Sequence, residues 1–146
     1  MTVCLDGGKV AGKISEAFSD SVVFANEMAV IVNSHSLYQV AEFLRNTPEF
    51  EFDYLANLTA VDYTEYFEVV YHLVSLRHNH SLVLKTRCYD RGKPVVPSVV
   101  SLWRSADFQE REAYDLMGVS FDGHPNLKRL LLWEGFDGHP LRRDYL

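Results

Sequence analysis

The sequence predicts an α+β fold, a two-layer sandwich with helices on one face of a mainly antiparallel or mixed sheet. Apolar residues recur at helical spacing in several segments, and β-branched apolar runs separated by short turns lie between them. The resulting order, α-β-β-α-β-β-β-α followed by an irregular C-terminal tail, is typical of α+β domains. The 146 residues are the length of one domain.

The first half of the chain supplies two helices and a hairpin. Residues 9–18 place Val10, Ile14 and Phe18 four apart, which is the spacing of one helix face. The apolar runs SVVFA and MAVIVN flank Asn26-Glu27 and predict two hairpin strands. Ser36 is a candidate N-cap for a helix over SLYQVAEFLRN, which has one apolar stripe and a proline just past its end.

The middle of the chain predicts three strands. FDYLANLTAVDY is the apolar centre of a segment with six acids and no Lys or Arg, and it indicates a strand that enters an acidic loop. EVVYHLVSL and SLVLKTRCY then predict a long hairpin whose turn lies at residues 77–80. Their many β-branched residues argue against helix.

Two helices are expected next. Pro97 suits the first turn of a short helix PSVVSLW. A further helix, SADFQEREAYDLM, has Ser105 as a candidate cap and stops at Gly118, a residue suited to the C′ position. The chain from Val119 is rich in turn residues and predicts irregular structure.

Composition excludes several classes of function. A formal net charge of −6 and a pI of about 5.4 leave no general basic field for nucleic acid or anionic lipid. Cys4 and Cys88 are the only cysteines, so a four-cysteine iron–sulfur or zinc site cannot be built from this sequence. The first residues lack a signal-peptide core and the longest apolar run, MAVIV, is too short to span a bilayer, which favours a soluble, cytoplasmic protein.

The pentapeptide FDGHP occurs twice, at residues 121–125 and 136–140. Asp-Gly favours a tight turn, and proline makes the preceding histidine extended, so each unit holds a histidine at a defined corner. One hypothesis is a metal site, and its candidate ligands are His124, His139, Asp122 and Asp137. The favoured interpretation is two turns whose histidines hydrogen-bond to backbone or to a partner.

The helical segment QEREAYDLMG carries several charges. Its neighbouring carboxylates suggest acid–base chemistry. The favoured interpretation is a solvated helix face on which Arg111 and Asp115, at i and i+4, form an ion pair. No GxSxG, phosphate loop or HExxH is present. These absences argue against a self-sufficient enzyme.

From residue 110 onward the motifs EREAYDL, GVSFDGHPNLKR and GHPLRRDY together resemble the 30 kDa subunit family of respiratory complex I, the bacterial NADH:quinone oxidoreductase. NLTAVDY and EVVYHLVSLR are also similar to central strands of that family. The specific resemblance covers about residues 50–146. Met117 stands where the family often has an aromatic residue.

The resemblance implies a non-catalytic structural subunit of the peripheral arm of a proton-translocating, membrane-associated complex. It implies no flavin, iron–sulfur cluster or quinone on this chain, and the two cysteines and scattered histidines predict no bound metal. The expected partners are the quinone-site and terminal iron–sulfur cluster subunits, on the cytoplasmic side of the cell membrane, without nucleic acid and without direct membrane insertion. The expected interface residues are Glu110, Arg111, Glu112, Tyr114, Asp115, His124, Arg129, His139, Leu141, Arg142, Arg143, Asp144 and Tyr145.

We therefore expect one domain over residues 1–134 and a docking tail over 135–146. The tail follows LLLW and has few apolar residues at regular spacing, so it should be poorly tied to the domain. Two alternatives stay open. The chain is an equivalent subunit of a membrane-bound nickel–iron hydrogenase or F420H2 dehydrogenase, or it is a stand-alone metal-dependent hydrolase that uses the histidines of the two FDGHP turns.

Overall fold

The computed structural model describes residues 2–129, 131–132 and 137–145. In chain order the elements are β1 (Val3–Cys4), α1 (Gly7–Ala17), β2 (Val22–Ala25), β3 (Val30–Val32), the 3₁₀ turn η1 (Ser34–Ser36), α2 (Leu37–Asn46), β4 (Tyr54–Asp62), β5 (Phe67–Ser75), β6 (His80–Cys88), β7 (Val95–Pro97), α3 (Ala106–Met117) and β8 (Ser120–Asp122). The expected helices at residues 9–18, 36–46 and 105–117 and both expected hairpins are confirmed.

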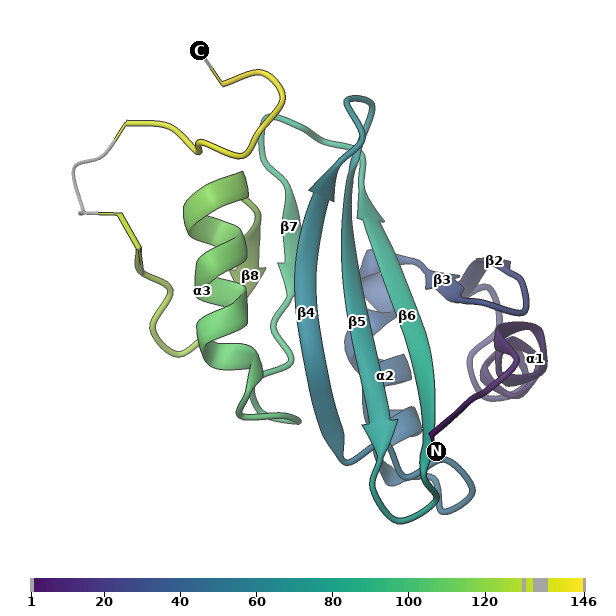
Figure 1. Ribbon diagram of the computed structural model, residues 1–146. Coiled ribbons are helices and arrows are strands. Elements are labelled where there is room, and N and C mark those ends of the chain that lie inside the picture. The colour runs from purple at the N-terminus through teal and green to yellow at the C-terminus, as the bar shows by residue number, and fades with distance from the viewer. Residues whose placement is uncertain (1, 130, 133–136, 146) are drawn as a thin grey trace.

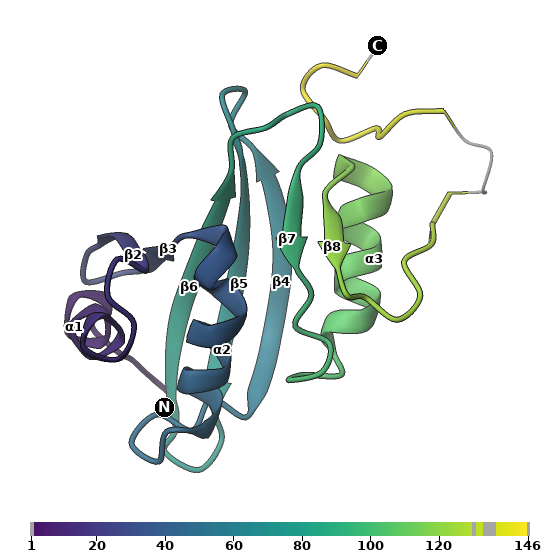
Figure 2. The same ribbon diagram turned by 180° about the vertical axis from the view of Figure 1, so that it is seen from behind.

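The main sheet is mixed and has the order β2-β3-β6-β5-β4, with β1 paired to β6. The β2–β3, β4–β5 and β5–β6 pairs are antiparallel, whereas β3 and β1 run parallel to β6. Helix α2 lies on one face of the sheet, α1 lies beside the β2–β3 hairpin, and α3 lies beside the edge strand β4 (Figures 1 and 2). The expected α+β class is confirmed.

The two faces of the sheet differ sharply. Alternate residues of β5, from Phe67 to Leu73, are fully buried and join the apolar side of α2 in one core. No helix of the described residues covers the opposite face (Figure 1). On that face Glu68 is shielded by Lys85 and Arg87 of β6, with N···O distances of 3.4 and 3.0 Å. One sheet face therefore builds the core and the other is open.

The expected helix at PSVVSLW is wrong. Val95–Pro97 forms strand β7, which pairs in parallel with β8, and residues 98–105 form turns. The Ser98 N–H donates to the carbonyl of Asp122 at 2.8 Å, so a partner more than twenty residues away extends the backbone where local propensity favours helix. Among the described residues after Val119, β8 is the only regular element, so the expected irregular structure is confirmed there.

The helix ends were predicted in part. Gly118 adopts φ 78° after α3, as expected of a left-handed C-terminal residue. Ser36 and Ser105 occupy the expected N-cap positions, but neither side chain makes a capping hydrogen bond to its helix. Ser36 ends the 3₁₀ turn η1, and the Ser105 hydroxyl instead donates to the Leu55 carbonyl at 2.9 Å. Among the described residues, no helix is long and apolar enough to cross a membrane.

Candidate functional site at the ends of helix α3

Helix α3 carries a buried carboxylate on its inner side. Glu110 is fully buried; one of its oxygens accepts a hydrogen bond from the Ser98 hydroxyl at 2.6 Å and the other from the Val99 N–H at 2.9 Å. Burial is the main cause that raises the pKa of Glu110 to about 7, and these two hydrogen bonds act in the opposite direction. The carboxyl joins α3 to the strand–turn segment after β7.

A second buried carboxylate, Asp115, holds the chain that follows β8. Its Oδ1 accepts from Arg129 at 2.8 Å, and its Oδ2 accepts from the N–H groups of Leu131 and Leu132 at 2.7 and 2.9 Å. The expected pair with Arg111 is replaced, because Arg111 donates to the carbonyls of residues 128 and 129. The interpretation of this helix as a solvated face with an intrahelical ion pair is therefore wrong.

The C-terminal segment, residues 137–145, satisfies the last carbonyl groups of α3. Helices leave four such carbonyls without an internal partner. Here the Asp115 carbonyl bonds to His139 Nδ1 at 2.9 Å, the Leu116 carbonyl accepts from the Leu141 N–H at 2.9 Å, and the Met117 carbonyl accepts from Arg142 at 2.6 Å. Cationic side chains at this end also complement the helix dipole.

A third buried carboxylate, Asp62 at the end of β4, attaches the same segment. Arg91 donates to both of its oxygens at 2.7 and 3.0 Å, and the Arg143 N–H donates at 2.8 Å. The hydrogen bond from Arg91 is the main cause that holds the pKa of Asp62 well below its usual range. Arg91 also bridges to Asp144 at 3.0 Å. The expectation of few ties between the tail and the domain is thus not met over residues 137–145, and the 134/135 boundary lies outside the described residues.

The two glycines of this junction have no room for a side chain. A Cβ on Gly118 would lie 2.7 Å from the His139 ring, and one on Gly138 (φ 90°) would lie 2.7 Å from the Tyr145 ring. Both positive φ values and both close approaches favour glycine. The segment is therefore packed closely against α3.

The two FDGHP turns hold opposite ends of one helix. His124 Nδ1 accepts the Asn126 N–H at 2.9 Å, so Nε2 carries the proton and faces Asp107, with its carboxylate at 3.0 Å and its carbonyl at 3.2 Å, in the first turn of α3. His139 instead contacts Asp115 near the helix end. Asp107 and Asp115 are eight residue steps apart, which corresponds to about 12 Å of helix.

This arrangement does not support the metal hypothesis. Among the described residues, no group of three His, Cys, Asp or Glu side chains could hold a metal ion. The favoured interpretation, histidines that hydrogen-bond to backbone, is confirmed for both turns.

The remaining expected interface residues are more accessible. Glu112 is exposed, Tyr114 packs its ring 5.9 Å from the His139 ring, and Leu141 is 61% exposed. Arg143, Asp144 and Tyr145 are exposed as well. By contrast Glu110 and Asp115 are fully buried within their own chain, so their carboxylates serve the domain itself.

Sequence reasoning missed Asp62, Arg91 and Ser98. Asp62 belongs to a stretch whose composition indicates an acidic loop, and Arg91 lies in an ordinary turn. The only signal is an acid that ends an alternating apolar strand, and it does not identify a partner 81 positions away.

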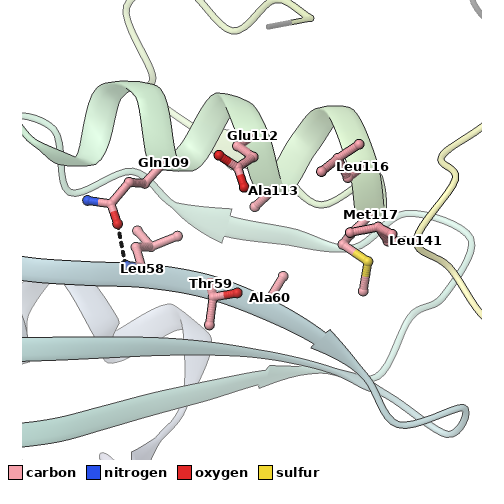
Figure 3. Close-up of a pocket in the computed structure, with 9 residues that line it drawn as sticks. All are labelled: Leu58, Thr59, Ala60, Gln109, Glu112, Ala113, Leu116, Met117 and Leu141. Carbon is pink, nitrogen blue, oxygen red and sulfur yellow. Dashed lines mark hydrogen bonds between the residues drawn. The ribbon is translucent and has the colours of Figure 1, made fainter. Parts of the chain in front are cut away.

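A small cleft lies between α3 and β4 (Figure 3). The Gln109 amide oxygen crosses it to accept the Leu58 N–H at 2.6 Å, and Leu141 closes the end near Met117. Its volume of about 40 Å³ has room for a few water molecules. The cleft is too small for a substrate of ordinary size.

Comparisons with known proteins identify the family. The family model of "Respiratory-chain NADH dehydrogenase, 30 Kd subunit" matches residues 30–146. An NADH-quinone oxidoreductase subunit of Roseiflexus sp. (strain RS-1) is 40% identical, with 97% of this chain and 85% of the relative covered. The equivalent oxidoreductase subunit of Coxiella burnetii (strain Dugway 5J108-111) is 42% identical, with 75% and 63% covered.

A solved structure agrees. A chain in the structure of the membrane-bound sulfane sulfur reductase, an archaeal respiratory membrane complex, matches with a TM-score of 0.69 and 27% identity, over 94% of this chain and 84% of that one. Fold and comparisons together define a subunit of a respiratory enzyme complex. The chain belongs to the family of the 30 Kd subunit of respiratory-chain NADH dehydrogenase, and is a complex I-type subunit.

Proposed function

We propose that this chain is a structural subunit of the peripheral arm of an NADH:quinone oxidoreductase, that it binds no cofactor itself, and that it has no catalytic activity alone. Its neighbours in this proposal are the subunits that carry the quinone site and the terminal iron–sulfur cluster, on the cytoplasmic side of the membrane. Family membership supports the type of complex. The use of Asp62, Glu110 and Asp115 inside the domain supports a structural role.

The observation that carries the proposal is the fixed C-terminal segment. Its backbone and its arginines are bonded to α3 and β4, while Leu141 and Tyr145 remain exposed at 61% and 40%. Because the segment is already ordered, its backbone loses little conformational entropy when its exposed apolar side chains bind a partner. We propose that Leu141, Arg143, Asp144 and Tyr145, with Glu112 and Tyr114 of α3, dock onto a neighbouring subunit.

The test is to replace Leu141→Asp in a strain that lacks the native gene. We expect a large loss of assembled complex and of membrane NADH:quinone reductase activity, because an interface anchor becomes a charge. Leu76→Asp is the matched control, since Leu76 is 69% exposed in the β5–β6 turn, far from α3. Both variants should melt as isolated chains within a few degrees of wild type. Equal assembly of the two variants would contradict the docking role.

A second candidate keeps the subunit and changes the enzyme. In this candidate the chain is the equivalent subunit of another respiratory membrane complex, such as a membrane-bound nickel–iron hydrogenase or an F420H2 dehydrogenase. The match to a chain of the sulfane sulfur reductase complex is the observation that supports it. The proteins that co-purify with the chain from native membranes decide between them. Recovery of NADH-oxidising subunits supports the first candidate, and a hydrogenase large subunit supports the second.

A further inference from the structure

A hollow of about 200 Å³ lies between the β2–β3 hairpin, the start of η1 and the end of β6. Ile31 and Arg87 form its floor on the open face of the sheet, since Ile31 pairs with Lys85 and Arg87 pairs with Glu68. His35 and Tyr89 form part of its wall. The β2–β3 hairpin that frames the hollow lies at the edge of the sheet opposite to β4 and α3 (Figure 1), and none of the lining residues belongs to the α3 site. It is therefore separate from the site described above.

The lining of the hollow favours negative charge. None of its eight lining residues is Asp or Glu, whereas Arg87, His35, Ser34 and Tyr89 can all donate hydrogen bonds. Arg87 shares the carboxylate of Glu68 with Lys85, so two cations face one anion and one positive charge is in excess. This local charge is opposite to the net charge of −6 of the whole chain.

The Arg87 side chain is also held in place. Its guanidinium lies 4.5 Å above the Tyr66 ring and its Nε donates to Glu68 at 3.0 Å. A cation fixed on both sides needs little reorganisation to accept a second anion. Burial acts to lower the pKa of Arg87, but the nearby Tyr89 and the carboxylate of Glu68 together raise it above its ordinary value.

The rim of the hollow is apolar. Of its lining residues, Val23 and Tyr89 are 53% and 64% exposed, and Phe24, which follows Val23 in β2, is 55% exposed. An apolar rim around a polar pocket is typical of a protein–protein contact with an anchoring side chain. A cavity of about 150 Å³ is enough for a benzene ring, so this hollow has room for the side chain of Asp or Glu together with part of its backbone.

We infer that the hollow receives an Asp or Glu side chain from a neighbouring subunit of the complex, with Arg87, His35 and Tyr89 as its partners and Val23 and Phe24 against the adjoining backbone. The inference rests on the proposed function, since it requires a neighbouring subunit. It adds a second contact area, at the β2–β3 edge of the sheet, opposite to β4 and α3.

The first test cancels the excess positive charge of the hollow without changing the core. His35→Glu places a carboxylate in the wall and should lower the amount of assembled complex by about tenfold, because like charges brought together in an interface are strongly unfavourable. His35→Lys should retain wild-type assembly. Gln39→Glu is the matched control, since it makes the same charge change on the exposed side of α2, outside the hollow. Equal assembly of His35→Glu and Gln39→Glu overturns the inference.

The second test identifies the occupant directly. A photoreactive phenylalanine analogue at Val23 in the assembled complex should cross-link to another subunit, and the linked peptide should contain Asp or Glu within a few residues of the linkage. An adduct with a second copy of this chain, a linked peptide without acids, or no adduct in an intact complex overturns the inference. Failure of wild-type protein to assemble at all would instead contradict the proposed function.

Discussion

Glu110 gives the sharpest test of the energetics of α3. Its pKa of about 7 lies above the ordinary value of 4.5, so the folded state favours the protonated form. The contribution of Glu110 to the free energy of unfolding is therefore largest below pH 4.5 and falls as the pH rises towards 7. Above pH 7 it no longer changes. At about 1.4 kcal/mol for each pKa unit, the difference corresponds to about 3 kcal/mol.

The substitution Glu110→Gln removes this dependence and keeps both contacts. The amide oxygen can accept the Val99 N–H, and the amide nitrogen can donate to the Ser98 hydroxyl. We expect the free energy of unfolding of the variant, minus that of wild type, to increase by about 3 kcal/mol between pH 4.5 and pH 8.

Urea unfolding followed by circular dichroism at pH 4.5, 6 and 8 measures this difference. Glu112→Gln is the control, because Glu112 lies on the same helix and is exposed; its effect should stay within about 0.5 kcal/mol at every pH. If Glu110→Gln differs from wild type by the same amount at all three pH values, the burial argument for Glu110 is refuted.

Three further predictions concern the junction of α3 with the C-terminal segment. Asp115→Asn should cost about 3–5 kcal/mol in urea unfolding, because it leaves Arg129 with a buried neutral partner; a cost below about 1 kcal/mol would contradict this. Gly138→Ala should lower the melting temperature more than Gly123→Ala, since both have positive φ but only a Cβ at 138 meets an aromatic ring; equal effects would exclude the Tyr145 contact as the cause. Asp62→Asn should destabilise most above the ordinary carboxyl pKa of about 4 and progressively less as the pH falls below it, because the depressed pKa of Asp62 contributes stability only while its unfolded form is ionised; acid titration of both proteins by circular dichroism measures it.

The sequence predicted correctly those elements whose structure depends on residue periodicity and on the backbone preferences of single residues. The stripe of α2 and the alternating apolar residues of β5 and β6 carry their own periodicity, and Gly118 carries its own backbone preference. The short helix predicted from Pro97 is absent because the preference of proline for a first helical turn is weaker than the pairing of β7 with β8.

The site was less predictable because its contacts are distant in sequence. Asp115 has Arg111 four residues before it, which is the ordinary ion-pair spacing, yet it pairs with Arg129 fourteen residues later. The backbone of Arg143 bonds to Asp62 across 81 positions. A short tail with no apolar periodicity can be firmly attached through hydrogen bonds, an ion pair and ring contacts, and the periodicity of the sequence does not detect these.

The late capping of α3 also affects how the protein is made. The Met117 carbonyl receives its hydrogen bond from a residue 25 positions further along the chain. At the usual speed of translation, about 5–20 residues per second, the ribosome takes about 1 to 5 seconds to add them. During that interval the last turn of α3 lacks these hydrogen-bond partners. The last turn of α3 therefore acquires its final hydrogen bonds from residues that are made well after the helix itself.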